Sequence, residues 1–144
     1  MNYYFDTSVI TSYYCNDNTT FFAQNALKHI PTAYISMLTE VELHSAIAKK
    51  IRTRELTEIT AQQVLKQFYT HHKEHHFKKV RILNKYYIEA CNWLKLFNSN
   101  LRTVDALHLA IAHHNGKILF TLDKDQANAA KKLDINAIYL KEYF

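Results

Sequence analysis

The clearest pattern of hydrophobic and polar positions lies in the last third of the chain. From Val104 to Ala112 every residue is apolar except Asp105 and His108. A helix that is hydrophobic on nearly all sides is typical of one buried within the fold. We therefore predict a buried helix that carries a carboxylate near its start.

A short strand is predicted directly after this helix. Gly116 is a typical helix stop, and Ile118–Phe120 is a continuous apolar run of the kind found in strands covered on both faces. The strand leads into a second acid, Asp123. Because buried carboxylates are costly to remove from water without partners, this arrangement requires a group that neutralises Asp105 and Asp123.

The rest of the chain shows the same alternation of short apolar runs and helical patterns. Asn2–Phe5 predicts a strand that ends at Asp6, with Thr7 or Ser8 as the cap of the next helix, and Ala33–Ile35 predicts a second strand. The other predicted elements are helices from Thr19 or Thr20 to Ile30, from about Leu38 to Ile51, from Thr57 into His71–His76, over Ile88–Phe97 and over Gln126–Leu133, and extended segments at Val80–Leu83 and Ala137–Leu140.

Short strands that are apolar throughout and alternate with helices predict an α/β fold with a central parallel sheet between helices. A chain of 144 residues has the usual size of one domain, so residues 1–144 are expected to form a single domain. Hydrophobic residues make up 48% and charged residues 22%, which favours an ordered chain over a disordered one.

The net charge and the cysteines bear on partners and location. A formal charge of +5 suits a polyanionic partner such as a nucleic acid. Cys15 and Cys91 lack the spacing of a metal site and are interpreted as thiols in a reducing compartment. With neither a signal peptide nor a run long enough to span a bilayer, the chain is expected to be cytoplasmic and away from membranes.

Acidic residues are placed by this pattern near one edge of the sheet. In open parallel sheets the ligand crevice lies beyond the carboxyl ends of the strands, and Asp6 and Asp123 both lie at such ends. Asp105 begins the helix before one of these strands, and Glu42 lies in the first turns of the helix after the second strand. A cluster of this kind requires a cation to remain ionised, and oxygen ligands alone favour Mg²⁺ or Mn²⁺ over Zn²⁺.

Each of these acids also has a structural explanation, which the sequence leaves open. Asp6 and Asp123 can cap the helices that follow them, and Asp105 can be a first-turn acid stabilised by the helix dipole. Thr39 and Glu42 fit a capping box. Only the joint occurrence of the acids favours a shared site.

Four segments carry a more specific pattern: FDTS at Phe5–Ser8, ISMLTEVELHSAIAKK at Ile35–Lys50, LRTVDALHLAIA at Leu101–Ala112 and LFTLDKD at Leu119–Asp125. In this order they resemble the PIN-domain ribonucleases of the VapC toxin type. The Asp-Ala-Leu-His-Leu-Ala block is the most diagnostic part, and residues 51–100 carry little of the resemblance. It implies a PIN-like three-layer α/β/α fold with a central parallel sheet.

The resemblance also implies which residues form the site. Glu42 is chosen over Glu40 because it precedes Leu43, as in the Glu-Leu pair of the family. The implied acidic residues, catalytic and metal-binding, are Asp6, Glu42, Asp105 and Asp123, with Thr121 and either Thr7 or Ser8 as supporting polar groups.

The activity implied by the resemblance is hydrolysis of RNA phosphodiester bonds by an endoribonuclease that depends on Mg²⁺ or Mn²⁺. Asp6 and Asp105 would ligate the ion directly, and Glu42 and Asp123 would complete its shell. The resemblance further implies a toxin that is bound by a cognate antitoxin protein and that forms a homodimer.

Two other functions compete with this interpretation. A phosphohydrolase of the haloacid-dehalogenase type would use Asp6 as its nucleophile, but it would require an acid where this chain has Ser8. A catalytically silent PIN-like module that only binds or regulates is the other alternative, against which the presence of all the acids argues.

The histidines of His71–His76 and the carboxylate of Asp125 each have a structural explanation that we prefer to a functional one. His71–His76 contains pairs at helical spacing that would suit a transition metal, but a solvated helix end is favoured because no Glu or Cys stands in a recognised relation to them. Asp125 can share the role of Asp123 or cap the next helix, and the cap is favoured.

The buried helix and the helix of Glu42 raise two further questions. His108 can hydrogen-bond Asp105 or be a satisfied core histidine. Basic residues at the end of the Glu42 helix are usually a solvated face, although in a ribonuclease they can contact phosphates; they are Lys49, Lys50, Arg52 and Arg54.

Overall fold

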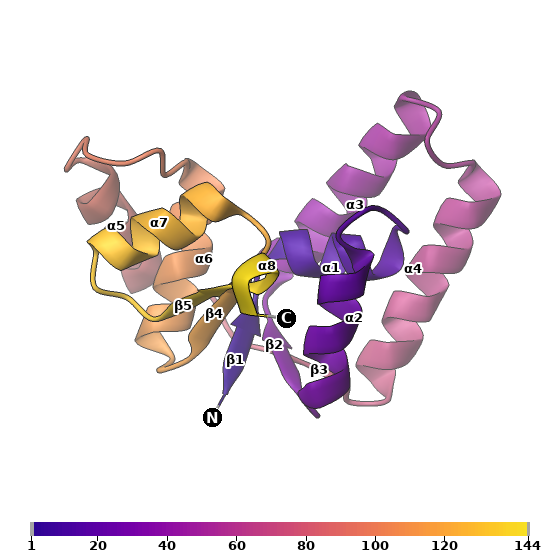
Figure 1. Cartoon of the computed structure of the whole chain (residues 1–144), viewed down its shortest axis with the longest axis horizontal. Coiled ribbons are helices and arrows are strands. Elements are labelled where there is room, and N and C mark those ends of the chain that lie inside the picture. The colour runs from indigo at the N-terminus through magenta and orange to yellow at the C-terminus, as the bar shows by residue number, and fades with distance from the viewer. Residues whose placement is uncertain (1, 144) are drawn as a thin grey trace.

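A parallel sheet of short strands forms the centre of the molecule (Figure 1). The computed structural model describes residues 2–143, and within them five strands pair in the order β3-β2-β1-β4-β5, every pair parallel. This topology confirms the predicted α/β fold with a central parallel sheet. The strands are β1 (Tyr3–Phe5), β2 (Ala33–Ile35), β3 (Phe77–Lys79), β4 (Ile118–Thr121) and β5 (Ala137–Tyr139).

Successive residues of the central strands point to opposite faces of the sheet. Tyr4 of β1 and Leu119 of β4 are paired in register and pack into one buried cluster. Phe5 and Phe120, the next pair along, pack into the other cluster. Both faces are therefore covered, which explains why these strands are apolar throughout instead of alternating between apolar and polar residues.

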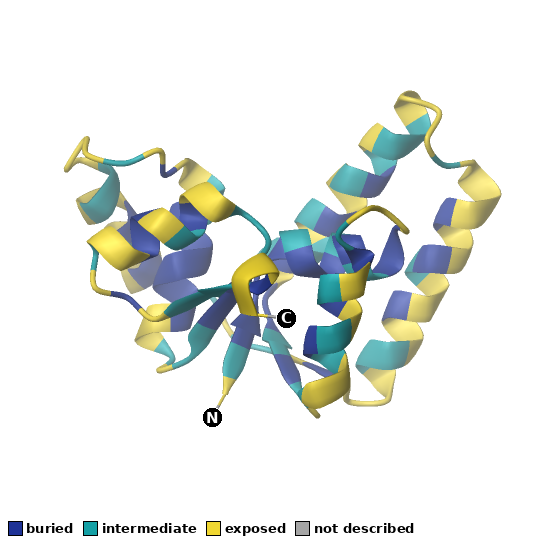
Figure 2. Ribbon diagram, in the orientation of Figure 1, coloured by how far each residue is buried: buried dark blue, intermediate teal, exposed yellow. Residues whose placement is uncertain are grey.

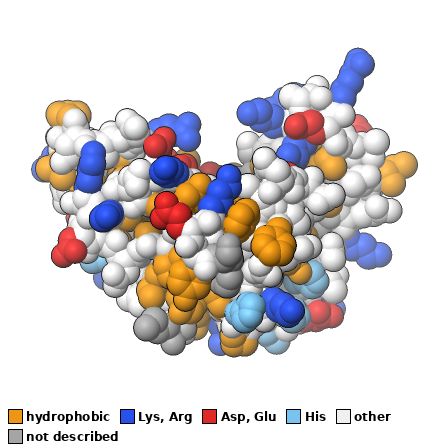
Figure 3. Space-filling view, in the orientation of Figure 1, with side chains coloured by type: hydrophobic (Ala, Val, Ile, Leu, Met, Phe, Trp, Pro, Cys, Tyr) orange, Lys and Arg blue, Asp and Glu red, His pale blue; other side chains and the backbone are white. Residues whose placement is uncertain are grey.

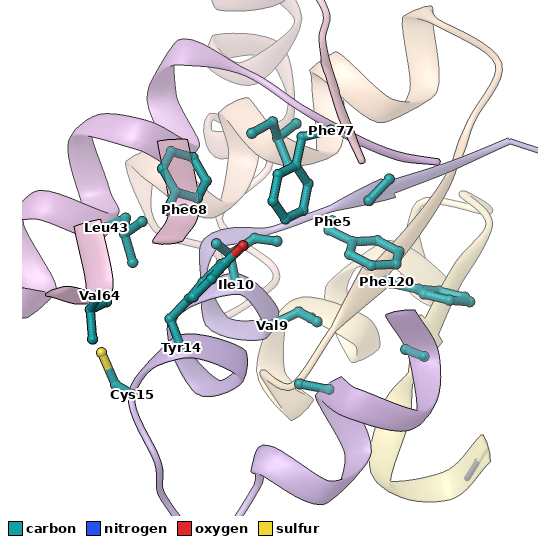
Figure 4. Packing of buried hydrophobic residues seen from close by; sticks show 14 of the residues in the cluster. Phe5, Val9, Ile10, Tyr14, Cys15, Leu43, Val64, Phe68, Phe77 and Phe120 are labelled. Carbon is teal, nitrogen blue, oxygen red and sulfur yellow. The ribbon is translucent and has the colours of Figure 1, made fainter. Parts of the chain in front are cut away.

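Helices lie on both faces of the sheet and give the predicted three layers (Figure 1). Figure 4 shows the cluster that contains Phe5 and Phe120, where these two residues of the sheet meet Val9 and Ile10 of the first helix. Helices on this face are α1 (Thr7–Tyr14), α2 (Thr20–His29), α3 (Met37–Arg52), α4 (Glu58–Lys73) and the short α8 (Leu140–Tyr143). Helices on the other face are α5 (Asn84–Leu94), α6 (Thr103–His114) and α7 (Lys124–Lys132).

Helix α6 is the buried helix that its composition predicts. Every residue from Ala106 to Ala112 is buried, including His108, whose exposed fraction is 2% (Figure 2). The helix packs against α5 on one side and β4 on the other. Because α6 is enclosed, any polar side chain on it must find its partners inside the protein.

The helix caps confirm one set of expectations, that Asp6 and Asp123 cap the helices that follow them, and differ from the sequence predictions in three places. Asp6, and neither Thr7 nor Ser8, is the N-cap of α1, where its carboxylate accepts the backbone N–H of Val9. Asp123 is the N-cap of α7 and accepts the N–H groups of Asp125 and Gln126, so the prediction that Asp125 caps this helix is wrong. Asp125 instead lies in the first turn of α7.

The capping box predicted at Thr39 and Glu42 is also wrong. Helix α3 begins one residue before the predicted start, and its N-cap is Ser36, which forms the capping box with Thr39. Ser36 and Thr39 therefore already accept backbone N–H groups at the start of the helix. The carboxylate of Glu42, one turn further on, is therefore free to act elsewhere.

The middle of the chain departs most from its predicted elements. The strand lies at β3, Phe77–Lys79, just before the predicted segment Val80–Leu83. Helix α5 ends at Leu94, whereas the prediction continued it to Phe97. Phe97 has a φ of 54° and is 92% exposed, so it follows the helix and takes no part in its packing. None of the described helices is both long and apolar enough to cross a membrane.

Candidate active site

The strand order changes direction between β1 and β4, at the centre of the sheet. The chain moves from β1 outward to β2 and β3 on one side, and β4 and β5 lie on the other side. In open α/β sheets such a switch point leaves a crevice at the carboxyl ends of the strands. Asp6 directly follows β1, and Asp123 comes two residues after β4 ends, so both lie at this edge.

Asp6 is a buried carboxylate with a full set of hydrogen-bond donors. Its exposed fraction is 4%, Ser8 Oγ donates to Oδ1 at 2.5 Å, and Thr121 Oγ1 donates to Oδ2 at 2.5 Å. Burial raises the pKa of Asp6 from 3.8 to about 6, although the hydroxyl donors Ser8 and Thr121 oppose the rise. Asp6 is thus fixed in orientation and costly to ionise without a nearby cation.

The same two hydroxyls join the segments that follow β1 and β4. Ser8 Oγ accepts the backbone N–H of Leu122 at 3.0 Å, and Thr121 Oγ1 accepts the N–H of Asp123 at 2.9 Å. The sequence left open whether Thr7 or Ser8 contacts the acids. Both do, because Ser8 donates to Asp6 and Thr7 donates to Glu42. Two of the acids are thus each held by a hydroxyl from another element, Asp6 by Thr121 and Glu42 by Thr7.

Asp105 lies in the first turn of α6, close to Asp123. Its side chain is 19% exposed and pairs with Arg102, whose Nε lies 3.6 Å from Oδ2. Burial raises the pKa of Asp105, and the negative charge of Asp123 raises it further. Gln126, itself 1% exposed, donates from Nε2 to the backbone oxygen of Asp105 at 3.2 Å and thereby ties α7 to α6.

Glu42 faces the site from α3, whereas Glu40 does not. Thr7 Oγ1 donates to Glu42 Oε1 at 2.6 Å, and His108 Nε2 lies 2.5 Å from the same oxygen. Glu40 is instead held by the ammonium of Lys79 and by the Tyr69 hydroxyl, which donates at 2.7 Å. The two glutamates point to different partners, and only Glu42 contacts residues of α1 and α6.

Sequence reasoning missed or misplaced several polar residues around the acids. His108 is a satisfied core histidine whose partners are Glu42, Tyr4 and Thr7, and not Asp105. Tyr4 and Gln126 were not singled out at all, although both are buried next to the site. For Tyr4 the only signal was a hydroxyl in an otherwise apolar run, whereas Gln126 lies in a polar segment and had no such signal.

The chemistry of these side chains fits a hard divalent cation. The four acids offer carboxylate oxygens, and these are ligands that Mg²⁺ prefers. Burial raises the pKa of Asp6 and of Asp105, so ionisation of these carboxyl groups is costly, and a bound cation would reduce that cost. As the side chains stand, no three His, Cys, Asp or Glu residues within 2–143 are grouped closely enough to share an ion.

A groove runs from the acids along α3. It has a volume of about 550 Å³, begins at Thr7, Ser8 and Glu42, and ends at Lys49 and Lys50. Figure 3 shows the molecular surface hollowed at the top of the view, between the α7 side and the α3 side. The groove is lined by several hydroxyl groups, by the ammonium groups of Lys49 and Lys50 and by the carboxylate of Asp17, and its two lysines can contact an anionic ligand.

The histidines at the end of α4 are less solvated than expected. His71 Nδ1 lies 2.5 Å from the hydroxyl of Tyr14, and the His71 ring packs beside that of His76. Burial lowers the pKa of His71, and the nearby His76 lowers it further. The predicted solvated helix end is therefore wrong for His71, which helps to fix α4 against α1.

Three solved structures of similar fold have low sequence identity to this chain. FitAcB from Neisseria gonorrhoeae matches with a TM-score of 0.72 and 15% identity, over 96% of this chain and 98% of that chain. VapC20 from Mycobacterium tuberculosis, described as a sarcin-ricin loop cleaving toxin, matches with a TM-score of 0.68 and 16% identity, over 89% and 95%. A toxin-antitoxin complex from Klebsiella pneumoniae matches with a TM-score of 0.61 and 20% identity, over 88% and 91%.

These likenesses establish the fold. A comparison with curated proteins finds no match. The family model for the PIN domain matches residues 3–132, which include every strand except β5 and all four acids of the site. The resemblance found in the sequence is thereby confirmed at the level of the family, and the chain belongs to the PIN domain family.

Proposed function

We propose that the chain is a divalent-metal-dependent endoribonuclease that hydrolyses RNA phosphodiester bonds. The observation that carries this proposal is the position of Asp6, a buried carboxylate at the switch point of the sheet, with Asp105, Asp123 and Glu42 around the same crevice. Buried acids with perturbed pKa values at such a place are typical of functional sites. Membership of the PIN domain family supports the same conclusion.

The four acids have distinct roles in this proposal. Asp6 and Asp105 would ligate Mg²⁺ or Mn²⁺ directly, and Glu42 and Asp123 would complete the shell. The bound ion would lower the pKa of a water and stabilise negative charge on the phosphate and the leaving oxygen. Ser8 and Thr121 keep the Asp6 carboxylate oriented, and Thr7 does the same for Glu42.

The RNA backbone would lie in the groove along α3. Lys49 and Lys50 stand at the end of this groove away from the acids, and the chain carries a formal charge of +5. Lysines in this groove can bind a phosphate of the RNA other than the one being cleaved, mainly through charge. The likeness to a toxin described as cleaving the sarcin-ricin loop supports RNA as the substrate class.

We further propose that the chain is the toxin of a toxin-antitoxin pair, that an antitoxin protein covers its site, and that it forms a homodimer. The likeness in fold to a chain of a toxin-antitoxin complex supports the first of these. Helix α3 also leaves Met37 and Val41, one turn apart, 53% and 62% exposed beside the site. Light scattering of the purified chain, with and without its partner, tests both assemblies.

Cleavage of single-stranded RNA and of a tRNA pool tests the proposed activity. The purified chain, free of partners, is assayed with Mg²⁺, Mn²⁺ or EDTA beside Asp6→Asn and Asp105→Asn. We expect metal-dependent cleavage that falls at least about 100-fold in both variants. Asp134→Asn, a matched change of an exposed acid after α7, should cleave as the wild type does.

Two results would contradict the proposal. Cleavage that is unchanged in Asp6→Asn and Asp105→Asn would place the activity elsewhere or in a contaminant. Neither cleavage nor a rise in melting temperature with Mg²⁺ or Mn²⁺ would favour a silent PIN module that only binds.

A further inference from the structure

A series of buried hydrogen bonds that begins at Tyr4 of β1 holds the carboxylate of Glu42. Tyr4 Oη lies 2.8 Å from Ser36 Oγ and 2.7 Å from His108 Nδ1. His108 Nε2 in turn lies 2.5 Å from Glu42 Oε1. These hydrogen bonds connect β1, the N-cap of α3, α6 and the second turn of α3. Tyr4, Ser36 and His108 are all buried.

The direction of these hydrogen bonds follows from the groups themselves. A carboxylate only accepts, so His108 Nε2 carries the hydrogen that faces Glu42. Ser36 Oγ accepts a backbone N–H in its capping box and is free to donate to Tyr4 Oη. Because Nε2 carries the hydrogen, Nδ1 accepts, and the Tyr4 hydroxyl, 2.7 Å away, donates to it.

One oxygen of Glu42 is occupied by this arrangement, and the other is open. Oε1 receives the hydroxyl of Thr7 and the N–H of His108, whereas no hydrogen bond from a residue within 2–143 reaches Oε2. The Glu42 side chain is 30% exposed, while that of His108 is 2% exposed. The carboxylate is thus fixed from the protein side with Oε2 towards the groove.

Packing alone does not account for a histidine at this place. Every other residue from Ala106 to Ala112 is apolar, and an apolar side chain of similar size would fill the same space without partners. The imidazole requires two partners, and the chain supplies Tyr4 on one side and the site carboxylate on the other. What the imidazole adds is the orientation of Glu42.

We propose that His108 is a positioning residue of the nuclease site, which fixes Glu42 through Nε2 so that only Oε2 is offered to the metal shell, and that Tyr4 sets the orientation of the His108 ring. This inference rests on the proposed function, because it assigns Glu42 to the metal shell. Groups that orient metal ligands typically change metal affinity about 10- to 100-fold when they are removed.

Calorimetric titration of the metal-free chain with Mn²⁺ tests the proposal, with RNA cleavage as a second measurement. We expect His108→Leu to raise the Kd for Mn²⁺ about 10- to 100-fold. His108→Gln should recover most of the affinity, because its amide N–H can replace Nε2–H. Tyr4→Phe should weaken Mn²⁺ binding a few-fold, and its matched control is Tyr86→Phe, which removes a buried hydroxyl that contacts Asn115 away from the site.

The outcomes separate this inference from the proposed function. If the wild type neither binds Mn²⁺ nor cleaves RNA, the proposed function fails and this inference fails with it. If the wild type binds Mn²⁺ and folded His108→Leu and Tyr4→Phe bind it equally well, the inference alone is overturned, and His108 is only part of the core. Should His108→Leu not fold, the contrast between Tyr4→Phe and Tyr86→Phe decides between these results.

Discussion

The hydroxyl of Thr121 donates to Asp6 Oδ2 at 2.5 Å and joins two residues that are 115 positions apart in the chain. This hydrogen bond links the end of β4 to the segment after β1, at the point where the sheet changes direction. It also gives a buried carboxylate one of the hydrogen bonds that compensate for its burial. The stability of the fold and the charge of the site are therefore coupled through Asp6.

Asp6→Asn should stabilise the metal-free protein at neutral and alkaline pH. The pKa of Asp6 is raised from 3.8 to about 6 in the folded state, so the folded chain binds this proton more tightly than the unfolded chain. The contribution of this proton to the free energy of unfolding is consequently present in full below about pH 4 and is lost as the pH rises through about 6. The pKa difference corresponds to about 3 kcal/mol at most, and we expect a net gain of about 1 to 2 kcal/mol at pH 8.

The asparagine can keep most of the contacts of Asp6. Thr121 Oγ1 can accept from the new amide and donate instead to Gln126 Oε1, which already lies 3.0 Å away. Urea unfolding in EDTA at several values between pH 4 and pH 8 measures the effect. Curves of unfolding free energy that run parallel for wild type and variant would show that Asp6 is not the group responsible.

Mg²⁺ or Mn²⁺ should raise the melting temperature of the wild type and have little effect on Asp6→Asn or Asp105→Asn. An ion that binds only the folded state stabilises it by about 2.7 kcal/mol at 100 times its Kd. Because Asp6 must lose its proton to bind, the effect should grow as the pH rises through about 6. Differential scanning fluorimetry with Mg²⁺ or Mn²⁺ at equal concentrations measures it, and an equal response of the three proteins would refute the assignment.

Replacement of Asp123 separates its role as a helix cap from its role in the site. Asp123→Asn retains a good N-cap for α7 but removes the charge that raises the pKa of Asp105. We expect its stability to stay within about 0.5 kcal/mol of the wild type while RNA cleavage falls strongly. Asp123→Ala should lose about 1 kcal/mol in addition.

Asp125→Ala is the matched control for this pair of variants. Asp125 is exposed and lies in the first turn of α7, where an acid contributes only a few tenths of a kcal/mol. Thermal unfolding and cleavage rates together distinguish the two acids. A larger loss of cleavage in Asp125→Ala than in Asp123→Asn would show that Asp125, and not Asp123, is the acid of the site.

Lys49→Ala with Lys50→Ala should weaken RNA binding and leave the chemical step nearly intact. Both lysines line the groove at the end away from the acids. For single-stranded RNA, removing one lysine that binds a phosphate should reduce the dependence of log K on log salt by about 0.7. The KM for RNA at several salt concentrations gives this slope, with Lys141→Ala on α8 as a control that also removes a positive charge. An unchanged slope would place the RNA elsewhere.

Much of the fold and of the acidic set was predictable from the sequence because the relevant signals are local. The apolar runs before Asp6 and near Asp123 predicted buried strands, and the strands of a parallel sheet end at the same edge. The helix of residues 104–112 was predicted to be buried because its apolar residues leave it no polar face. Motif order along the chain then sufficed to recognise the family.

The element boundaries were less predictable because several residues compete to cap each helix. Thr7, Ser8 and Asp6 are all good N-caps by composition, and only the backbone path out of β1 selects Asp6. The same competition misplaced the start of α3, where Ser36 takes the position. Local propensity cannot rank residues that differ only in where the preceding strand ends.

The sequence by itself determined the class of fold, the family and the acids that mark one edge of the sheet, since each follows from a short run of residues. The tertiary structure alone decided which groups surround those acids. His108 meets Glu42 across 66 positions and Tyr4 across 104, and no periodicity relates such distant side chains. A buried imidazole must find partners wherever packing places them, so its role becomes visible only when β1, α3 and α6 are assembled.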